Sequence, residues 1–128
     1  PVQMVWQHPE TVVDPLLTLG RTLNEAGAVE ERLLDALHIE PDWLSRYPSE
    51  LSGGELQRFC LARALNPAVR FLLCDEISAM LDLVTQAQIW NFLLDEAGRR
   101  DLGLLIVSHD DALLERVCTR VETMPWKA

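Results

Sequence analysis

The spacing of apolar residues changes from strand-like to helix-like near the start of the chain. The opening stretch, PVQMVWQHPE, mixes β-forming residues and stops at Pro9, which predicts the end of a strand that runs into a loop. From about residue 14 to residue 48, LLTLGRTLNEAG and VEERLLDALHI have the spacing of short helices separated by glycines and prolines. An apolar stripe recurs there at spacings of three and four, at Val29, Leu33, Leu34 and Leu37. This half of the chain is predicted to form a small helical layer.

The second half alternates between buried strands and helices. The run VRFLLCDE is almost continuously apolar until two acids, which is typical of a strand in a parallel sheet covered on both faces. A helix is expected next, because apolar residues recur at Leu83, Ala87, Trp90, Leu94 and Ala97. LGLLIVSHD has the pattern of another short buried strand, DDALLERVC that of a helix, and TRVETM that of a candidate last strand. Strand, helix and strand of this length form a right-handed crossover, so we predict an α/β fold in which both strands end at one edge of a parallel sheet. Ligands bind at that edge in open α/β sheets.

The stretch LSGGELQR, residues 51–58, opens the helix that is predicted from Gly53 to about residue 65. Ser52 and Glu55 have the spacing of a capping box, in which the serine hydroxyl accepts a backbone N–H and the glutamate reaches back. That pattern does not account for Gly53 and Gly54, since each glycine costs about 1 kcal/mol relative to alanine inside a helix. A bare backbone at a helix start lets an anion approach the N–H groups, where the helix dipole favours negative charge. The pair therefore indicates a phosphate-binding helix start.

Polar residues follow both buried strands of the second half. Asp75 and Glu76 come directly after FLLC, and His109 ends IVSHD. Two carboxylates at such an edge suit a Mg²⁺ ion held through its water shell and a water activated for attack. By themselves, the acids could equally cap the next loop, and a histidine after a strand is more often a hydrogen-bonded loop residue. His8 and His38 lack this context and are assigned to the surface.

Composition narrows the class of protein. The chain has 128 residues and a net charge of −9, which argues against a nucleic-acid-binding surface. No apolar run approaches the roughly 20 residues needed to span a bilayer. Cys60, Cys74 and Cys118 lie far apart and are expected to be buried, reduced thiols. The only lysine is Lys127, so this sequence holds no phosphate-binding loop of the form GxxxxGK[ST], and its start at a proline suggests a piece of a longer protein.

In order, these segments resemble the nucleotide-binding domain of ABC transporters. LSGGELQR looks like the signature motif, and FLLCDE looks like Walker B with Glu76 as its catalytic glutamate. VQMVWQHPE resembles the Q-loop with Gln7 as its glutamine, residues 78–82 the D-loop, and IVSHD the H-loop with His109. The resemblance implies three parts: a Q-loop region (1–10), a helical subdomain that ends in the signature helix (11–66), and the second half of a RecA-like α/β core (67–128). The fold would be the C-terminal part of an ABC-type P-loop NTPase domain.

The resemblance also implies a role for each matched residue. ATP would lie between two ATPase subunits, with the signature helix of one facing the nucleotide held by the other. Asp75 would hold Mg²⁺ through water, Glu76 would be the general base, and His109 would sense the γ-phosphate. Gln7 would touch the metal or the water and move with a membrane permease. The residues implied to bind nucleotide are Ser52, Gly53, Gly54, Glu55 and Asp82.

Two departures from the family pattern change the expectations. The Walker A loop and the aromatic residue that stacks on adenine belong upstream of Gln7, so this chain alone is expected to bind ATP and Mg²⁺ weakly and to turn over no ATP. DEISAMLD has Ile77 and Ala79 where the family commonly has proline and serine. With the LVTQAQIW that follows, it looks like the branch that imports peptides, opines or nickel in bacteria.

These observations lead to one main hypothesis and two alternatives. The main one is part of an ATPase subunit that powers an importer, on the cytoplasmic face of the bacterial inner membrane, with a second ATPase subunit and a permease as partners. A soluble ABC ATPase of translation or DNA repair shares these motifs, although the chain has no sustained heptads of the kind that repair proteins carry. A non-catalytic module that pairs with a full-length subunit is the third reading.

On the main hypothesis, Trp6 and Gln7 would lie at the surface that binds the permease. Alternatively, Trp6 is a core residue. Apolar surface of the strands is expected to be exposed.

Overall fold

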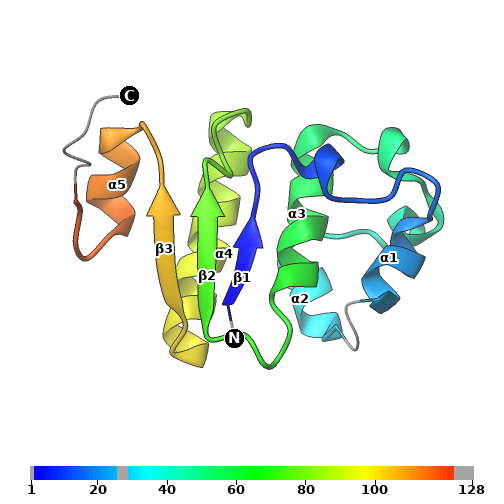
Figure 1. Ribbon diagram of the computed structural model, residues 1–128, viewed down its shortest axis with the longest axis horizontal. Coiled ribbons are helices and arrows are strands. Elements are labelled where there is room, and N and C mark those ends of the chain that lie inside the picture. Colours follow the sequence, from blue (N-terminus) through cyan, green and yellow to red (C-terminus); the bar gives the residue numbers. More distant parts are fainter. Residues whose placement is uncertain (1, 26–28, 123–128) are drawn as a thin grey trace.

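A parallel three-stranded sheet organises the second half of the molecule. The computed structural model describes residues 2–25 and 29–122 (Figure 1). Strands β1 (Val2–Val5), β2 (Phe71–Asp75) and β3 (Gly103–Val107) lie in the order β1-β2-β3, and all pairs are parallel. Helix α4 (Leu83–Arg100) connects β2 to β3 and crosses one face of the sheet, behind the strands in Figure 1. The predicted crossover and fold class are confirmed, so the carboxyl ends of the strands share one edge.

The helical layer lies beside β1 and is built from short elements. It contains α1 (Leu19–Glu25), α2 (Glu31–Ala36) and three 3₁₀ turns at Pro9–Thr11, Pro41–Ser45 and Pro48–Glu50. Prolines open all three turns, because their fixed φ angle suits a first helical position. Helix α3 (Gly53–Ala64) stands between this layer and the sheet (Figure 1).

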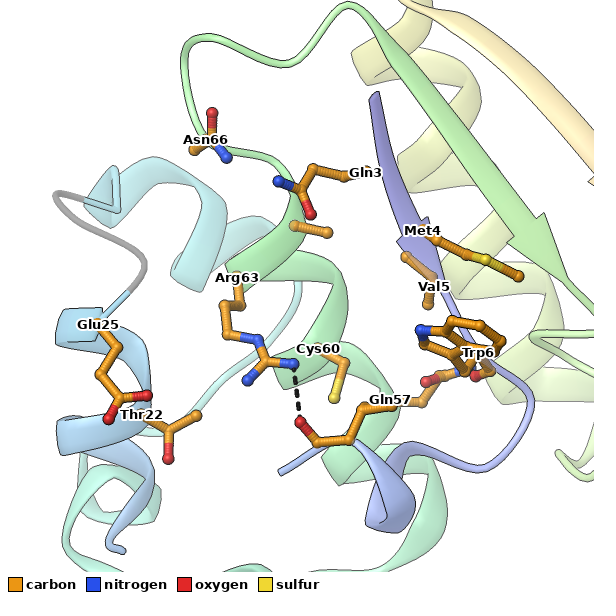
Figure 2. Close-up of a pocket in the computed structure, with 12 residues that line it drawn as sticks. Gln3, Met4, Val5, Trp6, Thr22, Glu25, Gln57, Cys60, Arg63 and Asn66 are labelled. Atoms are coloured by element: carbon orange, nitrogen blue, oxygen red, sulfur yellow. Dashed lines mark hydrogen bonds between the residues drawn. The ribbon is translucent and has the colours of Figure 1, made fainter. Parts of the chain in front are cut away.

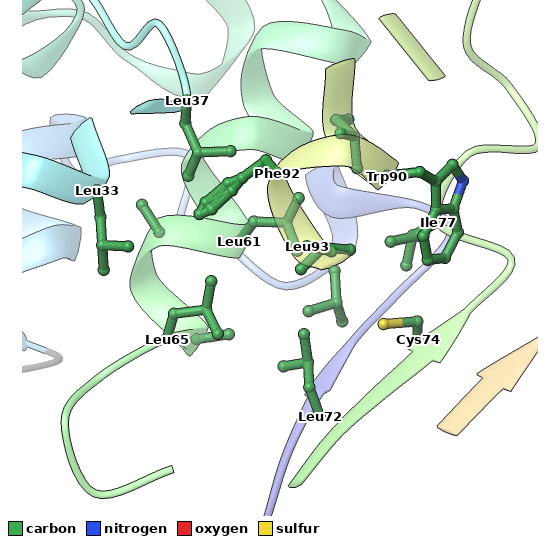
Figure 3. Close-up of a cluster of buried hydrophobic side chains, with 14 of the residues drawn as sticks. Leu33, Leu37, Leu61, Leu65, Leu72, Cys74, Ile77, Trp90, Phe92 and Leu93 are labelled. Carbon is green, nitrogen blue, oxygen red and sulfur yellow. The ribbon is translucent and has the colours of Figure 1, made fainter. Parts of the chain in front are cut away.

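Helix α3 joins two clusters of buried apolar side chains. Leu61 and Leu65 pack into the main cluster with Leu72 of β2 and Leu93 of α4 (Figure 3). Leu56, Phe59 and Cys60, on another side of the helix, pack with Leu19 and Leu23 of α1. The predicted stripe of the helical layer is confirmed, since Leu33 and Leu37 are buried in the main cluster and Val29 and Leu34 pack against it. The helix that carries the signature-like motif is thus fixed from both sides.

Helix α4 was predicted correctly, but the face that it buries was predicted only in part, since Trp90 is buried and Ala97 packs against the main cluster. Leu83 is 82% exposed and Leu94 38% exposed, although both belong to the predicted stripe. Besides Trp90, the buried side chains are Ile89, Phe92, Leu93 and Glu96. The helix carries apolar residues around much of its circumference, so spacing alone does not identify the face that meets the sheet.

Only one face of the sheet is covered by described residues, which corrects the prediction of a strand buried on both faces. Leu72 and Cys74 point into the core, whereas Phe71 on the other face is 57% exposed. Leu105 and Val107 of β3 are also more than half exposed. The cause is that no described element packs there, and the expectation of exposed apolar strand surface is confirmed.

Three further expectations are settled by the structure. Residues 119–122 of the candidate last strand form no strand, and the rest of that stretch lies outside the described residues. Cys60 and Cys74 are buried and free as expected, and burial raises their pKa values to about 11 and about 12. Cys118 is only partly buried, because it follows the last turn of α5 (Asp111–Val117) at the edge of the molecule.

The surface assignments of single residues are also clear. His8 and His38 are exposed, as predicted. Trp6 is 45% exposed, which contradicts its reading as a core residue and follows from its place just beyond the end of an edge strand. No described helix is both long and apolar enough to cross a membrane.

Candidate functional site

The carboxyl edge of the sheet brings together four of the predicted site residues. Gln7 lies two positions after β1, Asp75 is the last residue of β2, Glu76 follows it, and His109 lies two positions after β3. Because β1, β2 and β3 are parallel and adjacent, these positions share one edge. Gln7, Asp75 and Glu76 are partly buried and His109 is exposed. The sequence expectation of a common edge is met.

Glu76 has the most constrained backbone of this group. Its φ angle is +53°, a left-handed conformation that costs a residue with a side chain of order 1–3 kcal/mol. The conformation is held by the Glu76 N–H, which donates to the carbonyl of Val107 at 2.9 Å. The strand β3 therefore fixes the turn that directs the Glu76 carboxylate.

One oxygen of the Glu76 carboxylate lacks a hydrogen-bond donor among the described residues. Its side chain is 15% exposed, and Oε1 lies 3.4 Å from Nε2 of His109, whose side chain is fully exposed. Oε1 is buried and accepts no hydrogen bond from any described residue. A buried carboxylate oxygen without a donor favours the approach of a group that can supply one, such as a water.

Asp75 and Gln7 supply oxygen atoms of the kind that a hard cation takes. A carboxylate and an amide oxygen suit Mg²⁺, which keeps several of its own waters and needs few protein ligands. No group of three or more His, Cys, Asp or Glu side chains with the spacing of a closed metal site occurs among the described residues. The carboxylate of Asp75 and the amide oxygen of Gln7 are of the kind that suits a Mg²⁺ ion with most of its own waters retained.

The start of α3 has the predicted capping box. The Ser52 hydroxyl accepts the Glu55 N–H at 3.2 Å, and Glu55 Oε1 accepts the Ser52 N–H at 2.9 Å. The two N–H groups between them, at Gly53 and Gly54, have no partner within the helix. Gly53 is exposed, and a Cβ atom added there would meet no atom within 4 Å. The helix start is open to an incoming anion.

Gly54 has a second reason to be glycine that sequence reasoning missed. A Cβ atom at this position would lie 3.3 Å from Thr85 Cγ2 and 3.7 Å from Leu81 Cδ2. The start of α4 therefore packs closely against the start of α3. This contact of Gly54 could not be predicted from the sequence, because the two helix starts are about thirty residues apart along the chain.

Asp82 caps α4 beside the glycines. Its Oδ1 accepts the Thr85 N–H at 2.8 Å and its Oδ2 accepts the Thr85 hydroxyl at 3.0 Å. The hydrogen bond from the Thr85 N–H is the main reason that the pKa of Asp82 is lowered. A hollow of about 230 Å³ lies between the two helix starts, lined by residues 52–55, Arg58, residues 80–82 and Thr85. Figure 1 shows both helix starts at the same end of the molecule as the strand ends.

Three side chains that were not among the predicted site residues hold the segment after Glu76. Gln57 of α3 donates to the Ile77 carbonyl at 2.9 Å and to the Trp6 carbonyl at 3.0 Å. Gln86 of α4 donates to two carbonyls of the 78–82 segment, and Trp90 donates its indole N–H to the Ser78 hydroxyl at 3.0 Å. Gln57 stands inside LSGGELQR, but its spacing shows only a helical position, so its contacts could not be predicted.

A second cavity, of about 320 Å³, is larger than the hollow between the helix starts and has Gln57 in its lining (Figure 2). β1, α1 and α3 form its walls, and its polar lining includes Thr22, Glu25 and Arg63. Arg63 donates to the Val12 carbonyl at 3.3 Å, which ties α3 to the loop after β1. None of the predicted site residues lines this cavity, although Trp6 and Gln57, which lie beside the sheet edge, do.

The comparisons with known proteins agree with this geometry. Residues 1–79, which hold the Gln7 loop, the α3 start and the Asp75–Glu76 pair, match the family described as ABC transporter. The chain belongs to this family. Among its curated relatives are the glutathione import ATP-binding protein GsiA of Pectobacterium atrosepticum, 37% identical over 96% of this chain, and the nickel import ATP-binding protein NikE of Rhodospirillum rubrum, 39% identical over 94%. The chain spans 22% of the first relative and 48% of the second.

Solved ABC structures have the same fold. MJ0796, a bacterial ABC transporter cassette in a dimeric structure, matches with a TM-score of 0.68 and 25% identity over 88% of this ABC chain and 55% of that one. CbiO1 of Clostridium perfringens, part of the transporter complex cbiONQ, matches with a TM-score of 0.71 and 20% identity over 85% and 47%. The predicted family and fold class are confirmed, with import proteins among the relatives.

Proposed function

We propose that the protein carrying this ABC chain is the ATP-hydrolysing subunit of a bacterial importer. The observation that carries the proposal is Glu76, whose buried, unpartnered Oε1 stands at the sheet edge beside Asp75 and His109. A transport ATPase needs a base for the attacking water and a cation site next to it. In this proposal, residues 1–10 form the Q-loop region, 11–66 the helical subdomain and 67–128 the second half of the α/β core.

Glu76 acts as the general base in this scheme. Its Oε1 accepts the proton of the water that attacks the γ-phosphate, and the φ angle of +53° keeps the carboxylate at the edge. His109 Nε2, 3.4 Å away, is placed to donate to a phosphate oxygen when its exposed ring turns from Glu76. Asp75 and Gln7 would hold Mg²⁺. Mg²⁺, when bound, neutralises charge on the phosphates.

The α3 start serves the nucleotide of a second subunit. The N–H groups of Gly53 and Gly54 and the positive end of the helix dipole suit a phosphate group, and nothing in the described chain covers Gly53. Ser52, Glu55 and Asp82 hold the shape of this surface through their caps. The dimeric structure of MJ0796 supports an arrangement of two ATPase subunits.

A membrane permease is the partner that would convert hydrolysis into import. Trp6 is 45% exposed next to Gln7, so this side of the sheet edge offers an aromatic contact for such a partner. The nickel and glutathione import relatives support a nickel or peptide-like substrate.

The subunit would then work at the cytoplasmic face of the inner membrane. The 128 residues alone, without a GxxxxGK[ST] loop, would bind ATP weakly and not turn it over.

Glu76→Gln in the complete gene product tests the proposal. The amide keeps the shape of the side chain but accepts no proton, so ATP hydrolysis should fall by about 10²- to 10⁴-fold while ATP still binds. Phosphate release and nucleotide binding are measured side by side. The control is Glu115→Gln on the exposed surface of α5, which should hydrolyse ATP at the wild-type rate. Wild-type turnover by Glu76→Gln would refute the assigned base.

A further inference from the structure

Gln57 is a buried polar side chain that hydrogen-bonds to the loop after β1 and to the turn after β2. It is 1% exposed and lies one helical turn after Gly53 on α3. Its Nε2 donates to the Trp6 carbonyl at 3.0 Å and to the Ile77 carbonyl at 2.9 Å. The first carbonyl belongs to the peptide group that carries the Gln7 N–H. The second belongs to the residue directly after Glu76.

The chemistry of the position requires a neutral side chain with two N–H donors on one atom. Both acceptors are backbone carbonyls, so the amide nitrogen must face them and the orientation of the amide is fixed. Gln57 Oε1 points elsewhere and accepts no hydrogen bond from a described residue. A carboxylate here would face two carbonyls with acceptors only, and an apolar side chain would leave both carbonyls unpaired.

We propose that Gln57 is a positioning residue that locks the Gln7 loop and the Glu76 turn to the first turns of α3. The inference rests on the proposed function for its consequence, because Gln7 and Glu76 would serve the nucleotide of their own subunit. Gly53 and Gly54 would serve that of the partner. One buried amide thus connects two nucleotide sites through a single subunit, and a shift of the α3 start is passed to the residues that activate water.

The structure gives this connection a direct route. Ile77 is buried and directly follows the strained Glu76, and its carbonyl accepts the hydrogen bond from Gln57 of α3. Gln86 and Trp90 hold the following residues from α4 only. Among the described residues, Gln57 is the side chain that hydrogen-bonds to both the loop after β1 and the turn after β2.

The test uses Gln57→Met in the complete gene product. Methionine keeps the length of the side chain and removes both donors. Hydrogen exchange should become about 10-fold faster in peptides that cover residues 5–9 and 76–80, because one buried and one partly buried hydrogen bond are lost. The matched control is Gln86→Met, which removes donors from Ser78 and Leu81 carbonyls and should speed exchange near residues 78–82 but not at residues 5–9.

Kinetics separates positioning from stability. Misplacement of Gln7 and Glu76 should lower kcat for ATP by about 10- to 100-fold and leave KM nearly unchanged. If Gln57→Met does not fold, Gln57→Asn, which keeps both donors on a chain one methylene shorter, should show a smaller increase in exchange at the same two peptides. Unchanged exchange at residues 5–9 in the folded variant would overturn the proposal. That readout needs no ATPase activity, so it stands apart from a failure of the proposed function, which Glu76→Gln tests.

Discussion

At the scale of single residues, two poorly exposed glutamates have opposite surroundings. Glu96 is 4% exposed, and its carboxylate accepts hydrogen bonds from Arg32 and lies 3.8 Å from Arg100 Nη1. The hydrogen bond to Glu96 is also the main cause that raises the pKa of Arg32. Glu76 is 15% exposed, and its Oε1 has only the fully exposed His109 nearby. The first carboxylate holds α2 against α4, and the second holds no other described residue through a hydrogen bond to Oε1.

Stability measurements should separate these two carboxylates. Glu96→Gln removes the countercharge of Arg100 and leaves Arg32 with Glu30 alone, so the free energy of unfolding should fall by about 1–3 kcal/mol. The loss is smaller than for a fully buried pair because Arg32 is partly solvated. Glu76→Gln should change the free energy of unfolding by less than about 0.5 kcal/mol, since no described donor depends on it. Urea unfolding of both variants tests this, and equal losses would contradict the distinction.

At the scale of secondary structure, α3 combines an exposed start with a buried body. Ser52 and Glu55 cap the helix, and Phe59 and Leu61 are fully buried in different clusters. The rigid body fixes where the open start points. The two glycines of that start differ in surroundings, since Gly53 faces open space and Gly54 lies against Thr85.

Alanine at each glycine should reveal this difference. Gly53→Ala should raise the free energy of unfolding by about 0.5–1 kcal/mol, because alanine loses less backbone entropy and meets no atom. Gly54→Ala should give a smaller gain or a loss, because its Cβ atom would lie 3.3 Å from Thr85. In the complete gene product, Gly53→Ala should also weaken ATP-dependent pairing of subunits. A gain in stability with unchanged pairing would show that Gly53 is not needed for a ligand.

The sequence predicted elements better than it predicted their contacts. Short sequence patterns were enough to predict β2, β3 and the start of α3, because an apolar run, a polar strand end or a capping box each spans only a few consecutive residues. The buried face of α4 was predicted only in part, at Trp90 and Ala97, since which apolar side meets the sheet depends on packing. The bonds of Gln57 were also missed, because their acceptors lie 51 and 20 residues away along the chain. The sheet edge was predictable because parallel topology alone brings Asp75 and His109 together.

At the scale of the whole molecule, the uncovered face of the sheet exposes apolar side chains to solvent. Val2, Phe71, Leu105 and Val107 are each about half exposed or more. Parallel sheets are normally covered on both faces, and a contiguous apolar patch favours association. β3 is also the last strand of the described sheet, so its outer edge has unpaired backbone groups.

The 128-residue chain on its own is therefore expected to self-associate through this face. Leu105 and Val107 can be replaced together by threonine. Threonine is β-branched and suits a strand, but it exposes less apolar area. The double variant should sediment as a smaller species than the wild type at the same concentration. A double replacement of exposed polar residues on α5, Glu115→Gln with Arg116→Gln, serves as the control. Identical sedimentation of all three chains would show that this face does not drive association.

The indole of Trp90 gives the chain an optical probe of its own. Because this ring is 4% exposed and donates its N–H to the hydroxyl of Ser78, its fluorescence depends on a segment that begins two residues after Glu76. With the other tryptophans changed to phenylalanine, the emission colour of this one ring would follow rearrangement of that segment in real time, without any attached dye.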